Sequence, residues 1–225
     1  VSSGTATTFL NTGGITFGDS TTDVSTFTNG LTATASAVSL SGTVGTTNSN
    51  MTLGAVTLSQ NGTVKSGSGI ITIASVSGAN KLSLQDNTSN SRGLVVVNGA
   101  ATIGQIETFA QNYAVSLLGT TTVTSASTFN NTGATTFGDG GNTVDTVTFT
   151  GGLTAKAGAV NLNSKLVTTN NLLDIGAVTL AGNSTLQSGT GTITVGSITD
   201  GANSYTLNLQ DGSGSGAASQ GSVIF

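Results

Sequence analysis

The chain has 225 residues and a formal net charge of −4, and only 6% of its residues are charged, against about 25% in an ordinary soluble domain. It contains no Cys and no His, which excludes disulfide bonds and removes the commonest general base and metal ligand. Its basic residues are scattered, so it lacks the basic stripe of a nucleic-acid-binding surface. They are Lys65, Lys81, Arg92, Lys156 and Lys165.

Short segments of alternating apolar and polar residues follow one another along the chain, and no stretch of a dozen residues keeps the apolar spacing of a helix. Gly, Asn, Asp and Ser separate these segments, and such residues favour turns. The sequence therefore predicts an all-β chain with turns at 29–30, 61–62, 66–69, 98–99 and 188–191. In chain order, the predicted strands are 15–17, 37–40, 55–58, 71–73, 81–84, 144–149, 159–162, 193–195 and 205–209.

The chain repeats itself at an offset of about 120 residues. Positions 9–19 and 129–139 are identical at 8 of 11 places, and 54–76 and 176–198 agree at 13 of 23. Repetition at a fixed period is typical of architectures that grow along one axis. We expect a single continuous domain, 1–225, with a first repeat at 7–126 and an incomplete second repeat at 127–225.

Direct repetition, Gly-rich corners and the absence of Pro predict a right-handed parallel β-helix, or β-solenoid. Coils of about 20 to 25 residues, stacked ~4.8 Å apart, would give some ten coils and a rod roughly 50 Å long. Six Phe residues at matched positions are expected to form stacks inside the rod. They are Phe9, Phe17 and Phe27 in the first repeat, and Phe129, Phe137 and Phe149 in the second.

The end of the chain aligns with the middle of its own repeat, because 221–225 corresponds to 93–97. An uncovered solenoid end is a template for further strand pairing. We therefore expect the natural object to continue, either covalently or by head-to-tail stacking of copies. The residues expected at these self-association surfaces are Val1, Val223, Ile224 and Phe225.

No signal peptide is visible in 1–20, and apolar runs such as 94–97 are far shorter than the ~20 residues that span a bilayer. The sequence predicts no membrane insertion, and any export signal is expected outside it.

Two turns carry paired carboxylates, Asp19 with Asp23 and Asp139 with Asp145. A hard cation such as Ca²⁺ takes six to eight oxygen ligands, and such a turn could supply two carboxylates and several carbonyls. The same residues could instead cap backbone amides, and the Gly-rich nonapeptide of calcium-binding rolls is not repeated. A weak Ca²⁺ site and a capped turn both remain open, and no other cofactor is expected.

No enzyme is predicted. The nine carboxylates are not joined by the Lys or Arg that a β-helical polysaccharide enzyme would need, and no base stands beside the abundant Ser and Thr. An ice-binding surface would need ranks of Thr once per coil, and the Thr-rich segments 120–124 and 146–150 do not recur in that way.

The segment 87–128 has no full counterpart in the second repeat, and it contains Arg92, Glu107 and Tyr113 in an otherwise bland chain. A specific binding surface, for example for surface glycans, would be expected here. A purely structural shaft would instead present matching surfaces in both repeats.

Segments such as 54–58, 148–154 and 185–194 resemble the repeat regions of filamentous-haemagglutinin-like exoproteins and autotransporter-type adhesins of bacteria. The resemblance covers the whole chain, and it lies in composition and repeat style. It implies a right-handed β-helical shaft, secretion, and a place at the bacterial surface or outside the cell. We expect a structural shaft or filament segment that pairs with copies of itself, and the alternative is a carbohydrate- or receptor-binding module of an adhesin.

Overall fold

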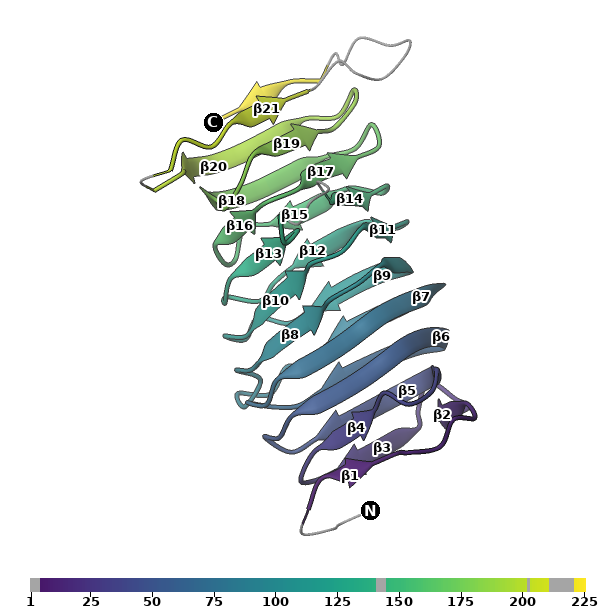
Figure 1. The fold of residues 1–225 in the computed structure, drawn as a ribbon. Helices are drawn as coiled ribbons and strands as arrows, with labels where there is room; N and C mark the ends of the chain where they lie inside the picture. Colours follow the sequence, from purple (N-terminus) through teal and green to yellow (C-terminus); the bar gives the residue numbers. More distant parts are fainter. Residues whose placement is uncertain (1–4, 141–144, 202, 211–220) are drawn as a thin grey trace.

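The computed structural model describes residues 5–140, 145–201, 203–210 and 221–225. In these residues the chain is all-β, contains no helix and winds into a parallel β-solenoid of about 10 turns (Figure 1). The strands are β1 (Thr7–Thr8), β2 (Ile15–Phe17), β3 (Val24–Phe27), β4 (Leu31–Ala33), β5 (Val38–Thr46), β6 (Met51–Lys65), β7 (Ile71–Leu84), β8 (Leu94–Val97), β9 (Ala101–Thr108), β10 (Ala114–Leu117), β11 (Thr121–Val123), β12 (Ser127–Phe129), β13 (Thr135–Phe137), β14 (Thr146–Phe149), β15 (Leu153–Ala155), β16 (Val160–Leu162), β17 (Lys165–Thr168), β18 (Leu173–Leu180), β19 (Ser184–Gln187), β20 (Ile193–Thr199), β21 (Leu207–Leu209) and β22 (Val223–Ile224).

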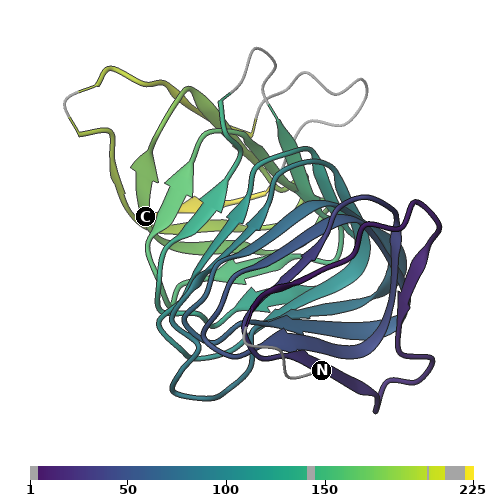
Figure 2. The ribbon, with the colours of Figure 1, turned by 60° about the horizontal axis from the view of Figure 1, so that its bottom comes forward.

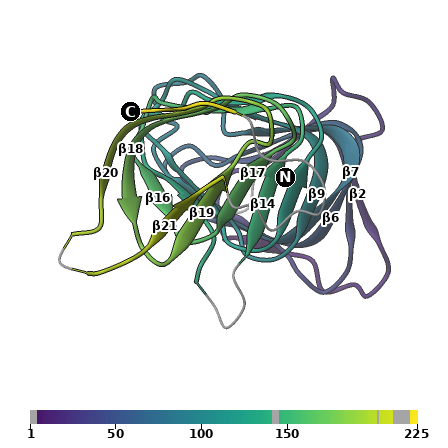
Figure 3. The same cartoon turned by 90° about the horizontal axis from the view of Figure 1, so that it is seen from above.

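Parallel pairing sorts the strands into three columns, which we call faces A, B and C. Each coil passes through the faces in that order, and long strands such as β6 bend around the corners and contribute to all three. Face A contains β1, β4, β8, β10, β13 and β16, and face B contains β2, β11, β14, β17, β19 and β21. Face C contains β3, β12, β15 and β22. The longer strands β5, β6, β7, β9, β18 and β20 each contribute to more than one face. Seen along the axis, the coils superpose around a common interior (Figure 3).

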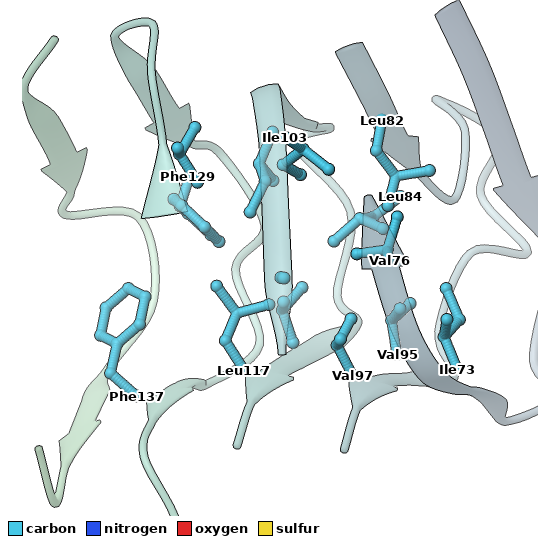
Figure 4. Close-up of a cluster of buried hydrophobic side chains, with 14 of the residues drawn as sticks. Ile73, Val76, Leu82, Leu84, Val95, Val97, Ile103, Leu117, Phe129 and Phe137 are labelled. Carbon is cyan, nitrogen blue, oxygen red and sulfur yellow. The ribbon is translucent and has the colours of Figure 1, made fainter. Parts of the chain in front are cut away.

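The interior is a continuous apolar core that follows the axis of the rod. Along most strands buried and less buried residues alternate, as period-two strands require. On face A, for example, Ile73, Val97, Leu117 and Phe137 stack in register. They point toward residues of face C such as Leu84 and Phe129 (Figure 4).

The six Phe residues form two clusters, and all are buried except Phe9, which is partly buried against the core. The members of a cluster come from different faces of the rod, so their place in the interior is confirmed but stacking between coils is not. Each cluster has three edge-to-face pairs, with ring centroids 5.6–5.9 Å apart around Phe17 and 5.7–5.9 Å apart around Phe137. Such geometry is favoured by the quadrupoles of the rings.

The two sequence repeats do not occupy a whole number of coils. Phe17 lies on face B, but its counterpart Phe137 lies on face A, and Phe27 on face C corresponds to Phe149 on face B. We count as one segment each passage of the chain along one face, so that a coil has three segments. Each Phe and its counterpart are seventeen segments apart. One repeat therefore spans five and two-thirds coils, and the second copy is turned by one third of a revolution about the axis.

The predicted turn at Asn61-Gly62 is wrong, because both residues lie inside β6. A Cβ on Gly62 would come within 2.9 Å of Cδ2 of Leu40, so this glycine makes room for core leucines. The predicted turns at 29–30, 66–69 and 188–191 are confirmed, with positive φ at Gly30, Gly67 and Gly189.

Candidate functional site

Within the described residues, ion pairs join charged side chains of neighbouring coils. Lys65 pairs with Asp86 at 3.2 Å, Lys81 with Glu107 at 2.9 Å, and Lys156 with Asp174 at 3.2 Å. All three are partly exposed, where such pairs contribute little to stability. Each pair cancels the charge of its two side chains.

In the first acidic turn, the Asp23 carboxylate is bound to backbone amides. Oδ2 of Asp23 accepts hydrogen bonds from the N–H groups of Asp19, at 2.9 Å, and Ser20, at 3.1 Å. The bond from Asp19 is the main reason that the pKa of Asp23 is lowered. The geometry matches the capped turn that the sequence analysis left open beside the calcium site.

In the second acidic turn, the carboxylate is held less closely by the backbone. Oδ2 of Asp145 accepts one long hydrogen bond, 3.4 Å, from the N–H of Asp139. Burial, chiefly, and the nearby Asp139 carboxylate raise the pKa of Asp145. Within the described part of the chain, no three acidic side chains gather around a common point, so calcium binding at either turn stays a prediction.

Arg92, Glu107 and Tyr113 do not form a joint surface, because Tyr113 is a core residue with 0% exposure. Its hydroxyl accepts a hydrogen bond from the N–H of Phe109 and donates one to the carbonyl of Leu84, both at 2.7 Å. Burial raises its pKa to about 12. The predicted ligand contact at Tyr113 is therefore wrong, since the hydroxyl is used inside the rod.

The other two residues reach solvent but have neighbours of their own. Nε of Arg92 donates to the carbonyl of Ser89 at 3.1 Å in the loop after β7. Glu107 accepts a 2.6 Å hydrogen bond from Ser83 and pairs with Lys81. The hydrogen bond from Ser83 is the largest single cause that lowers the pKa of Glu107, and Lys81 lowers it further. A binding role for Arg92 and Glu107 stays a prediction.

Both ends of the described stack have strands that pair on one side only. At the first coil, β1 pairs with β4, and β2 and β3 pair with β5, whereas at the last coil β21 pairs with β19 and β22 with β20. Figure 2 looks toward the first coil. Near the C-terminal edge, Ile224 is 51% and Phe225 is 71% exposed, and Val223 is half-buried. Val1 lies outside the described residues.

A polar hollow of about 230 Å³ lies on face C, across the first four coils. The Lys65–Asp86 ion pair lies in its lining, and exposed Thr and Asn side chains surround it. The stem of Lys65 runs over Gly45, where a Cβ would come within 3.0 Å of Cγ of Lys65. This hollow was not predicted from the sequence. A comparison of the two repeats could have pointed to it, because Gly45 and Lys65 of the first repeat are replaced by Val167 and Gln187 in the second.

No protein-family model, curated protein or solved structure matches this chain. The assignment as a β-solenoid therefore rests on the strand pairing described above. Among the described residues there is also no helix of the length and apolar character needed to cross a membrane.

Proposed function

We propose that this chain is a structural shaft segment of a bacterial surface fibre or adhesin, secreted to the cell surface or beyond it and joined end to end with further coils. The observation that carries the proposal is the unbroken parallel pairing of the described coils around one apolar core. Parallel strands stacked in this way can be extended along the axis by pairing with further strands.

The rest of the surface supports a mechanical role. Parallel pairing continues from the first coil to the last, and the core has no described break along the axis. The low content of charge, 6% of residues, removes most of the repulsion that would oppose close contact between copies. In the proposed shaft the coils wind in the right-handed sense that parallel β connections favour.

Electron microscopy of the purified chain at neutral pH tests the proposal. We expect thin filaments with an axial spacing of ~4.8 Å, the distance between paired strands. Discrete short rods at all concentrations would show that this chain does not stack on itself. Repeating the images with a chelator tests the calcium prediction, because filaments that need an ion at Asp19 and Asp23 or at Asp139 and Asp145 would be lost.

Two matched variants separate end-to-end from lateral association. Ile224→Lys places a charge on the edge strand β22, whereas Leu172→Lys places one at a similarly exposed apolar residue within the stack, 46% against 51% exposed. Lysine on an edge is a common way to block strand addition. We expect Ile224→Lys to abolish filaments and Leu172→Lys to leave them. The reverse result would show that copies associate through their sides.

A further inference from the structure

We propose that the hollow on face C is a binding subsite for a neutral saccharide. Gly45 is the last but one residue of β5, and it pairs with Thr26 of β3 on one side and with Lys65 of β6 on the other. Its φ is not in the left-handed region, so the backbone does not require glycine there. Glycine weakens a strand interior, and it often marks a place where another group approaches closely.

The second repeat has a larger residue at the same corner. Val167 lies between Thr148 of β14 and Gln187 of β19, in the place that Gly45 has between Thr26 and Lys65. The corner itself is preserved, since Asn48 and Asn170 both have positive φ and both accept a backbone hydrogen bond from the next coil. The first repeat therefore differs from the second at two paired positions of a common scaffold, by a missing side chain at Gly45 and an added cation at Lys65.

The ion pair in the hollow is held in one arrangement. Oδ2 of Asp86 accepts from Nζ of Lys65, and Oδ1 accepts from the hydroxyls of Thr88, at 2.6 Å, and Ser91, at 2.8 Å. Oδ1 also accepts from the N–H of Thr88 at 3.1 Å, so the protein holds the Asp86 carboxylate through both oxygens. The ammonium of Lys65 has three N–H donors, and one of them is used on Asp86, so it can also donate to a ligand oxygen.

The chemistry of the lining selects the ligand. One cation and one anion cancel, so the hollow offers no net charge to an ionic ligand. The exposed side chains of Thr26, Thr47, Thr88 and Asn90 both donate and accept hydrogen bonds. A sugar ring presents hydroxyl groups that do the same. The lining contains no aromatic side chain for stacking, so a single subsite is expected to bind weakly, with a dissociation constant on the order of 1 mM.

The test is a titration of the whole chain, followed by the amide signals in proton–nitrogen correlation spectra. The probes are methyl α-mannopyranoside, lactose and N-acetylglucosamine, with inorganic sulfate as the anionic comparison. We expect at least one neutral sugar to shift the amides of Gly45, Gly67 and Thr88 in a saturable way. Sulfate is expected to leave them unchanged.

Two variants copy the second repeat into the first. Gly45→Val places a side chain against the stem of Lys65 and so displaces the ammonium from the hollow, and Lys65→Gln removes the cation. Each should weaken binding at least about tenfold. Lys65→Gln lies at the surface, so it remains informative if Gly45→Val does not fold. Val167→Ala is the matched control, and it should leave the affinity unchanged.

Three results would overturn the proposal. The first is that no neutral sugar shifts these amides. The second is that the shifts persist in Lys65→Gln and in folded Gly45→Val. The third is that sulfate shifts the same amides and competes with the sugar, which would make the hollow an anion site.

Discussion

Amide side chains at the corners join each coil to the next. Asn48 and Asn170, at matched positions of the repeats, have φ of 51° and 55° and accept hydrogen bonds from the N–H groups of Ser68, at 3.1 Å, and Thr190, at 3.0 Å. Asn tolerates this left-handed conformation better than most residues. Because a corner leaves the strand ladder, its backbone amides need such partners, and a neutral amide supplies them without adding charge.

Gln85 is the clearest single-residue test of this corner chemistry. It has 0% exposure and φ of 66°, Oε1 accepts from the N–H of Ser66 at 2.9 Å, and Nε2 donates to Oγ of Ser66 at 3.1 Å. Gln85→Ala should lower the free energy of unfolding by about 2–3 kcal/mol, because it leaves buried groups of Ser66 without partners. Gln85→Gly should cost about 1 kcal/mol less, because glycine relieves the positive φ. Urea unfolding followed by circular dichroism measures both, and equal losses would exclude strain at this position.

Asp86 should make the chain sensitive to acid. Burial favours the neutral carboxyl, but hydrogen bonds from Thr88, Ser91 and Lys65 outweigh it and lower the pKa from 3.8 to about 2. A lowered native pKa stabilises the fold above the unfolded value, and this contribution is lost as pH falls from about 4 to about 2. We expect Asp86→Asn to be less stable than wild type at neutral pH and to show a smaller drop across that interval. Urea midpoints at several pH values test this, and parallel curves would contradict it.

At the scale of the strand, the position of a buried side chain along the rod decides how much it contributes to the stability of the fold. Phe137 packs in register between Leu117 on one side and Leu162 on the other, whereas Phe17 has a paired strand residue, Leu40, on one side only among the described residues. Their exposures are 0% and 5%. The same residue type in the same sequence motif thus has two neighbouring coils in one copy and one in the other.

This difference predicts unequal losses for matched substitutions. Phe137→Ala should cost about 3–5 kcal/mol, the usual range for a buried Phe, because rigid coils on both sides cannot close the cavity. Phe17→Ala should cost less, because the end coil can relax into the space. Unfolding of both variants in urea measures the difference. Losses of equal size would show that the first coil is as constrained as the seventh.

For the whole molecule, the sequence predicted the fold class well and the surface poorly. Alternation in segments such as 15–17, which coincides with β2, was sufficient because every coil needs the same period-two pattern. The turn predicted at Asn61-Gly62 is wrong because the chain can remain extended as it passes a corner of the solenoid. Tyr113 misled because its hydroxyl is buried against a carbonyl far away in sequence. The hollow depends on Gly45, Lys65 and Asp86 from three successive coils, and their register follows from corner lengths that composition does not reveal.

Corner lengths also explain why the repeat and the coil are out of step. Val38 pairs with Val56 only 18 residues later, but Thr121 pairs with Val147, 26 residues later. The sequence period is therefore visible without the structure, but the number of coils within it is not.

The one-third turn between the repeats, combined with the shift along the axis, relates them by an approximate threefold screw axis. If such copies continued along the axis, a given patch would return to the same side only after three copies, or seventeen coils, a distance of roughly 80 Å at ~4.8 Å per coil. Neighbouring rods lying side by side would then meet like surfaces at widely spaced points, which works against flat lateral sheets. Equivalent patches would still occur at every third of that distance along the axis, each one facing a different side of the rod.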